Sequence, residues 1–223
     1  MITEEERNQA KEMLSFIGRS PSCFHAVKNI SNVLVQHGFH EISEETGWNL
    51  EKGKSYFVKR NNSSLIAFTV PEDEFKRFLI SSCHSDSPSF KIKENPEIEG
   101  SGCVRLNIEK YGGMLMAPWL DRPLSLAGRV QVETEKGAES VLVDIDRDLL
   151  LIPNVAIHMN RSANDGYKWN PAVDMLPLLG SEETVGQLQS LLEQEAGGTI
   201  LGQDLYLYVR QKASIWGLEE EFI

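Results

Sequence analysis

The pattern of apolar residues changes near residue 90, and this change constrains the fold more strongly than any other feature of the sequence. Residues 1–83 combine two amphipathic helical patterns with short runs of β-forming residues, which is typical of an α/β arrangement. From about Lys91 to Pro153, one strand-forming run follows another, with glycine-containing or charged turns between them. Short strands at such spacing predict a small all-β unit, either a barrel or a sandwich.

Two helices are predicted near the N-terminus. Thr3 and Glu6 form a T-x-x-E capping box, and the apolar stripe that follows ends at Gly18. A second apolar stripe begins after the Ser-Pro-Ser sequence at residues 20–22 and ends at Gly38. We expect these two amphipathic helices to cover a sheet.

The strand predictions rest on runs rich in β-branched and aromatic residues. The run Phe78-Leu79-Ile80 shows no alternation of apolar and polar residues, so we expect a strand that is buried on both faces. A late helix is predicted from Ser181 to the paired glycines at 197–198. The predicted strands cover residues 55–60, 64–70, 78–83, 104–110, 114–117, 127–134, 141–145, 149–152 and 205–209.

The composition argues against several classes of function. Asp and Glu outnumber Lys and Arg by 33 to 22, and the net charge of −11 disfavours binding to nucleic acids or anionic membranes. No apolar run is long enough to cross a bilayer, and the acidic N-terminus lacks the order of a signal peptide. The 3 cysteines include no C-x-x-C pair, which argues against a disulfide framework. We therefore expect a soluble, cytoplasmic protein.

The sequence His84-Ser85-Asp86 is the strongest candidate for a functional site. It follows the predicted strand over residues 78–83, and α/β proteins place ligand sites at such strand ends. A neutral imidazole is a common zinc ligand, and a nearby carboxylate can orient the ring and raise its basicity. The alternative is a His–Asp hydrogen bond that only caps the strand, and the spacing by itself favours this alternative. His158, flanked by apolar residues, is more typical of a structural histidine.

Several short motifs, taken in order, resemble one family. They are SPSCFHAV at residues 20–27, GWNL at 47–50, SYF at 55–57, LIAF at 65–68, HSDSP at 84–88, YGG at 111–113, WLDR at 119–122, LAGR at 126–129, IP at 152–153 and AIH at 156–158. Together they resemble the aspartyl aminopeptidases, which are dinuclear zinc aminopeptidases. The resemblance covers nearly the whole chain.

The resemblance implies a fold of the α/β class. It implies a partial α/β zinc-peptidase catalytic domain that is interrupted by an inserted, mostly-β dimerisation domain. On this basis we expect residues 1–91 to be the N-terminal part of the catalytic domain, residues 92–203 to be the inserted domain, and residues 204–223 to begin the return into the catalytic domain.

The resemblance also implies roles for single residues. His84 would be a ligand of one of two zinc ions, and Asp86 would hold the His84 ring. The histidine that matches His158 reaches the active site of a neighbouring subunit, so His158 would contact substrate in trans. This analogy makes a substrate-contacting role for His158 as credible as a structural one. The implied substrate is a peptide with a free, acidic N-terminal residue, and the implied assembly is a homo-oligomer through the β-rich domain.

One difference from the family bears on whether the chain can be catalytically active by itself. Family members continue well past residue 223, and that continuation carries a bridging carboxylate, a pair of glutamates, an aspartate and a closing histidine. We therefore expect this chain to be an N-terminal half that lacks most of the catalytic site, and its apolar end at residues 215–223 favours truncation. The alternative is a catalytically inert assembly or regulatory subunit, or a truncated product without function.

Overall fold

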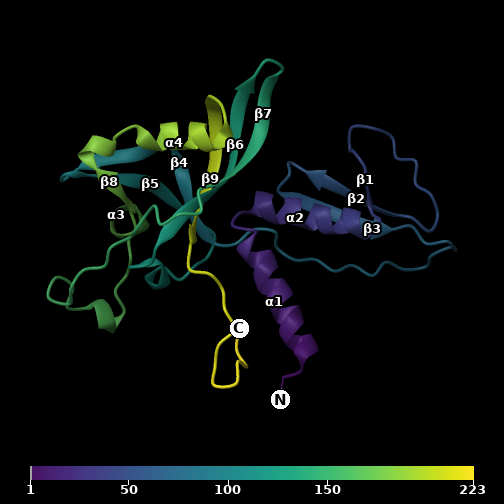
Figure 1. The fold of residues 1–223 in the computed structure, drawn as a ribbon, viewed down its shortest axis with the longest axis horizontal. Helices are drawn as coiled ribbons and strands as arrows, with labels where there is room; N and C mark the ends of the chain where they lie inside the picture. The colour runs from purple at the N-terminus through teal and green to yellow at the C-terminus, as the bar shows by residue number, and fades with distance from the viewer. Residues whose placement is uncertain (1) are drawn as a thin grey trace. The chain divides into compact units, whose positions relative to one another are not determined.

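In the computed structural model, which describes residues 2–223, the chain divides into two compact units (Figure 1). The first unit comprises the chain up to Ser87 together with Ala213–Ile223. The second unit is the continuous stretch Pro88–Lys212. Within residues 2–223, no helix combines the length and the apolar character that crossing a membrane requires.

The first unit begins with the two predicted helices, α1 (Glu4–Gly18) and α2 (Cys23–Gln36). The capping box is confirmed, because the Thr3 side chain accepts from the Glu6 amide and the Glu6 side chain accepts from the Thr3 amide. At the start of α2, the side chain of Ser22 accepts from the amide of His25. The two helices differ in packing: α2 buries Phe24 and Val27, whereas α1 has no buried residue.

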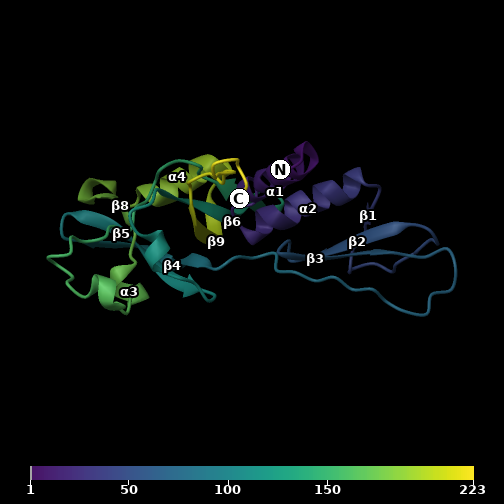
Figure 2. The same ribbon diagram turned by 90° about the horizontal axis from the view of Figure 1, so that it is seen from below.

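The sheet of the first unit has the order β1-β2-β3. Its strands are β1 (His40–Glu41), β2 (Ser55–Arg60) and β3 (Ser64–Thr69), and β2 pairs parallel with β1 and antiparallel with β3. In both views α2 lies against one face of β2 and β3 (Figures 1 and 2). The central strand β2 is buried at residues 56–58, and β3 forms an edge of the sheet.

The predicted buried strand over residues 78–83 is wrong. These residues have no regular secondary structure, and the side chains of Phe78, Leu79 and Ile80 are 77%, 100% and 83% exposed. A strand buried on both faces needs a paired strand and covering layers, and the described residues supply neither for this run. The composition of this run is typical of a buried strand, but no described residues pair with it or cover it.

The second unit is built on a six-stranded antiparallel sheet with the order β7-β6-β9-β4-β5-β8. The expectation of a barrel or a sandwich is wrong, since the described strands form one open sheet with β7 and β8 at its edges. The strands are β4 (Ser89–Gly100), β5 (Cys103–Tyr111), β6 (Leu124–Thr134), β7 (Gly137–Asp144), β8 (Leu178–Ser181) and β9 (Ile200–Val209).

The position of β9 fixes where the second unit ends. β9 pairs with β6 from Ile200 to Val209, so the whole strand belongs to the second unit. The family resemblance predicts a return into the catalytic domain from residue 204, whereas the compact second unit extends to Lys212. The assignment of catalytic and dimerisation roles to the two parts of the chain stays a prediction.

Three further segments differ from the sequence predictions. Residues 114–117 form no strand but lead into a 3₁₀ turn, η1 (Ala117–Trp119), and residues 150–152 make only isolated bridges. The late helix, α4 (Gln187–Ala196), begins after Gly186, whose left-handed backbone separates it from the 3₁₀ turn η3 (Glu182–Thr184). The remaining short helices are η2 (Ala163–Asp165) and α3 (Pro171–Asp174).

The main hydrophobic core lies in the second unit. Side chains from β4, β5, β6 and β9 meet there, and Leu188 and Leu192 of α4 join them. Phe90, Leu124 and Leu205 are fully buried in this cluster. The second unit therefore has a closed core of its own.

Candidate functional site

His84 and Asp86 lie in the first unit, in the segment that follows the exposed run at residues 78–83. The Nδ1 atom of His84 is 3.1 Å from the Oδ1 atom of Asp86, which confirms the His–Asp contact expected from their spacing. Ser85, between them, donates from its hydroxyl to the carbonyl oxygen of Ser63 at 2.7 Å. This bond holds the segment beside the start of β3.

The contact with Asp86 determines which ring nitrogen of His84 remains for a ligand. Because Nδ1 faces the carboxylate, the neutral ring keeps its Nε2 lone pair for a metal ion or a proton. The His84 side chain is 90% exposed and the Asp86 side chain 36% exposed. The imidazole is therefore accessible, and the carboxylate restricts its orientation.

The described residues do not complete a zinc site. Across residues 2–223, no group of three or more His, Cys, Asp or Glu side chains is arranged to hold a metal ion. A catalytic zinc ion needs about three protein ligands and an open position. His84, oriented by Asp86, fits one of those ligand positions, and the others need donors beyond the described arrangement.

His158 belongs to the second unit, in a turn at residues 157–159, and is exposed. The start of the loop that leads to it is held by Asp121, whose amide donates to the Ile152 carbonyl at 2.9 Å. The Asp121 carboxylate also accepts from the amide of Asn154 at 2.8 Å. These bonds fix the base of the loop, and the role of His158 itself stays a prediction.

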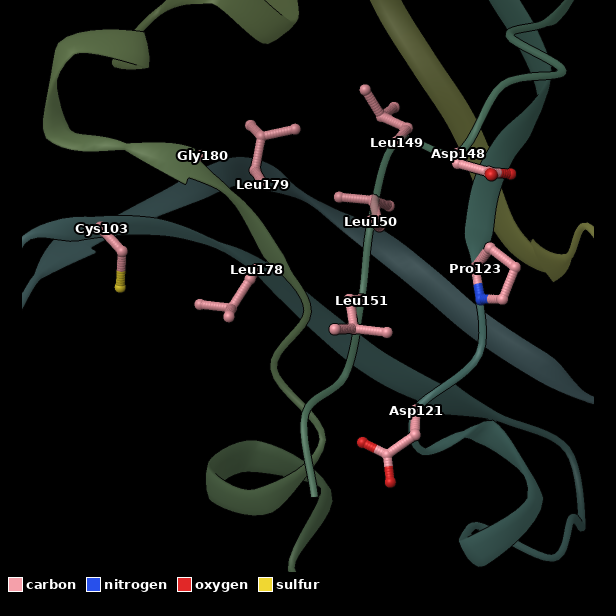
Figure 3. Close-up of a pocket in the computed structure, with 10 residues that line it drawn as sticks. All are labelled: Cys103, Asp121, Pro123, Asp148, Leu149, Leu150, Leu151, Leu178, Leu179 and Gly180. Atoms are coloured by element: carbon pink, nitrogen blue, oxygen red, sulfur yellow. The ribbon is translucent and has the colours of Figure 1, made fainter. Parts of the chain in front are cut away.

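The second unit contains a pocket with a volume of about 470 Å³ that no sequence motif predicts (Figure 3). Leucines from residues 149–151 and from β8 make up half of its lining residues, and Asp121 and Asp148 also line it. The lining residues are Cys103, Asp121, Pro123, Asp148, Leu149, Leu150, Leu151, Leu178, Leu179 and Gly180. The leucine runs were a usable sequence signal, but the pocket contains no histidine and resembles a surface for apolar groups more than a catalytic centre.

A half-buried hydrogen bond perturbs the ionisation of Tyr208 on β9. The hydroxyl of Tyr208 donates to Asp144 Oδ1 at 2.6 Å. Burial, together with the negative charge of Asp144, raises the pKa of Tyr208 well above its usual range. The neighbouring Arg210 pairs with both Asp146 and Asp148. These contacts join β9 to the end of β7 and the turn after it.

Comparison with known proteins supplies the family context. The model of the aminopeptidase I zinc metalloprotease family (M18) matches residues 16–223. A probable M18 family aminopeptidase 2 of Clostridium acetobutylicum is 46% identical over 232 aligned residues, which cover 99% of this chain and 54% of that protein. Aspartyl aminopeptidase 1 of Schizosaccharomyces pombe is 36% identical and aligns with 100% of this chain and 53% of its own length.

The fold is also similar to that of a solved structure. A chain in the cryo-EM structure of the complex of Ape4 and Nbr1 matches with a TM-score of 0.89 and 37% identity, over 95% of this chain and 46% of that chain. The agreement extends over both α/β and β-rich parts. The chain thus spans about half the length of the curated relatives it matches.

Proposed function

The chain belongs to the M18 family of zinc metalloproteases, and we propose that it acts as part of a zinc-dependent aminopeptidase that releases N-terminal, acidic residues from peptides. The observation that carries this proposal is the 46% identity to an M18 aminopeptidase over 99% of the chain. The similarity to aspartyl aminopeptidase 1 supports an acidic N-terminal residue as the substrate.

In this proposal His84 supplies one zinc ligand and Asp86 orients it. The 3.1 Å contact between Nδ1 and the carboxylate supports these roles, because a metal-binding histidine commonly donates its other ring N–H to such a group. The remaining ligands come from the part of the family's length that this chain does not span. Zinc in such a site polarises the scissile carbonyl and activates water.

The second unit takes the role of the inserted, oligomer-forming domain. Two features support this role. The second unit has its own hydrophobic core, and its sheet has edge strands that could contact other subunits. His158, exposed on a loop of this unit, would contact the substrate in the active site of a neighbouring subunit. A homo-oligomer is therefore the expected assembly.

A second candidate function is that of an inert assembly or regulatory subunit. The observation that favours it is that residues 2–223 contain no complete group of metal ligands. In this case the second unit would pair with a full-length relative and donate His158 without catalysis at His84.

Hydrolysis of aspartyl, glutamyl and leucyl chromogenic amides distinguishes the aminopeptidase function from that of an inert subunit. The purified chain is assayed with zinc or cobalt, alone and after co-expression with the portion of the Clostridium acetobutylicum relative that the chain does not match. We expect no turnover by the chain alone, and metal-dependent turnover by the pair with a preference for aspartyl and glutamyl amides.

The controls are EDTA and the substitutions His84→Ala and Asp86→Ala. EDTA and His84→Ala should each abolish turnover by the pair, and Asp86→Ala should reduce it by about 10- to 100-fold. Turnover that is unchanged in His84→Ala would contradict the ligand role. A pair that binds but hydrolyses none of the amides would favour the assembly subunit.

A further inference from the structure

Ser85 contacts a different neighbour from the two residues that it separates. His84 and Asp86 contact each other, with 3.1 Å between Nδ1 and Oδ1. The Ser85 hydroxyl instead donates to the carbonyl oxygen of Ser63, 22 positions earlier in the chain, at 2.7 Å. The chain bends at Ser85. The bond therefore links the segment that carries the candidate metal ligand to the sheet of the first unit.

The acceptor of this bond lies in a well-defined turn. Ser63 is the last residue of the turn between β2 and β3, and its amide donates to the carbonyl oxygen of Arg60 at 3.2 Å. Arg60 and Ser64 are paired where the two strands meet the turn. Asn61 and Asn62 have a left-handed backbone, with φ of 52° and 53°, which asparagine tolerates better than most residues. The strand pairing and the turn together fix the position of the Ser63 carbonyl.

The orientation of His84 depends on such hydrogen bonds. Its side chain is 90% exposed, so packing contributes little to holding the ring. Residues 78–83, which lead to it, have no regular secondary structure. Ser85 and Asp86 are half-buried, whereas His84 is exposed. The Asp86 contact restricts the ring relative to its own segment, and the Ser85 bond restricts that segment relative to the sheet.

We propose that Ser85 is a positioning residue for the metal-binding histidine, and that its bond to Ser63 seats the His84–Asp86 pair on the turn between β2 and β3. Ser85 acts through His84 and contacts neither metal nor substrate. The inference rests on the proposed function, because it concerns the histidine that is proposed there as a zinc ligand. Removing a group that orients a metal-binding histidine commonly weakens metal affinity by about 10- to 100-fold.

The proposal predicts an effect on zinc affinity and not on substrate binding. Ser85→Ala removes the hydroxyl, so the His84–Asp86 pair would sample positions in which the Nε2 lone pair does not face the metal. Zinc affinity should fall by about tenfold. Excess zinc should restore kcat, and KM for the amide should be unchanged. Ser85→Thr keeps a hydroxyl and should retain the zinc affinity within about twofold.

Nuclear magnetic resonance of the chain alone tests the positioning without metal or activity. Isotopically labelled histidine reports which ring nitrogen carries the proton at a fixed pH of about 8, where an ordinary imidazole is neutral. The signals that disappear in His84→Ala identify the ring. In the original chain the proton should be on Nδ1, which faces Asp86. Ser85→Ala should lower the ratio of this tautomer to the other at least about twofold, and Ser85→Thr should restore it.

Zinc affinity is measured by competition with a chelator. The chain is co-expressed with the portion of the Clostridium acetobutylicum relative that it does not match, or fused to that portion if the separate polypeptide does not fold. The original pair, Ser85→Ala and Ser85→Thr are then compared. The same preparations give kcat and KM for the aspartyl amide at limiting and at excess zinc.

Ser55→Ala provides the matched control. Ser55 is half-buried like Ser85, and its hydroxyl forms a hydrogen bond of 2.9 Å with the hydroxyl of Thr69 in the same sheet. Ser55 and Thr69 pair at the end of β2 and β3 that is opposite the turn. Ser55→Ala should leave the His84 ring signals unchanged and the zinc affinity within about twofold.

The outcomes separate this inference from the proposed function. A changed tautomer ratio in Ser85→Ala that Ser85→Thr restores supports positioning, even if the pair hydrolyses no amide. Unchanged ring signals in Ser85→Ala, equal changes in Ser55→Ala, or a Ser85→Thr that behaves like Ser85→Ala would overturn it. Zinc-dependent hydrolysis by a pair whose zinc affinity Ser85→Ala leaves unchanged would also overturn it, while the proposed function stands.

Discussion

The two units differ in how far they bury leucines that lie in apolar, β-forming runs. In the second unit, β9 lies between β6 and β4, and its Leu205 and Leu207 are 0% and 1% exposed. In the first unit, Leu79 lies in an equally apolar run and is 100% exposed. The difference shows that an apolar β-forming run becomes a buried strand only where neighbouring strands are present to pair with it.

Helix packing shows the same contrast. In the second unit α4 buries Leu188 and Leu192 in the core, whereas α1 in the first unit has no buried residue although it has a complete capping box. Caps and helical propensity define where a helix begins and ends, and tertiary packing supplies most of its stability. The second unit thus supplies packing partners for its helix, whereas the first unit leaves α1 without a buried side chain.

The largest expected effect comes from Gly128→Val, which would break the second unit at its centre. A Cβ atom at Gly128 would clash with the carbonyl oxygen of Asp204 and lie 2.9 Å from the Cα atom of Leu205. Both contacts are with the backbone of β9, so β6 and β9 would have to separate. The free energy of unfolding should fall by about 4 kcal/mol or more, as measured by denaturant titration.

Gly113→Val serves as the control for this substitution. A Cβ atom at Gly113 meets no described atom within 4 Å, outside its chain neighbours. The free energy of unfolding should change by no more than about 0.5 kcal/mol. Similar losses in Gly113→Val and Gly128→Val would contradict the close approach of β6 and β9.

A pair of leucine substitutions compares the two units directly. Leu205→Ala removes a fully buried side chain and should lower the free energy of unfolding by about 3 kcal/mol. Leu79→Ala removes a fully exposed one and should change it by less than about 0.5 kcal/mol. Equal losses in the isolated chain would show that Leu79 is packed in solution, against the contrast drawn here.

Tyr208→Phe should have a smaller, pH-dependent effect. Near neutral pH the loss of the hydrogen bond to Asp144 should lower the free energy of unfolding by about 1 kcal/mol. Because the pKa of Tyr208 is raised in the folded state, its contribution is complete below the ordinary tyrosine pKa of about 10 and declines above it.

Urea titrations from about pH 8 to about pH 11 measure this dependence. The difference between the original protein and Tyr208→Phe should narrow as the pH rises. A difference that stays constant or widens would show that the hydroxyl is not held in its protonated form by the fold.

Local signals in the sequence predicted those elements whose causes are local. The bounds of β2 follow from its β-forming run, and α1 begins where the Thr3–Glu6 capping box places it. The His84–Asp86 contact likewise follows from a separation of two positions along the chain. Such contacts depend on a few neighbouring residues.

The sequence-based predictions fail where residues that are distant in the chain determine the local structure. The run at residues 78–83 has the composition of a buried strand but no described strand to pair with. β4 was missed because Lys, Glu and Pro96 interrupt its apolar pattern, yet pairing with β5 holds it on both sides of an irregularity between Ile92 and Glu97. Local sequence patterns could not predict a complete set of zinc ligands, because such ligands come from distant positions that only the tertiary structure brings together.

Native-state hydrogen exchange on the chain alone tests the central contrast most directly. The amides of β6 and β9 should exchange slowly and together, with protection close to the global free energy of unfolding, while residues 75–83 exchange almost as fast as an unfolded peptide. Protection in residues 75–83 that equals the protection of β9 in the dilute, isolated chain would contradict the account, because it would show that the first unit completes its own sheet.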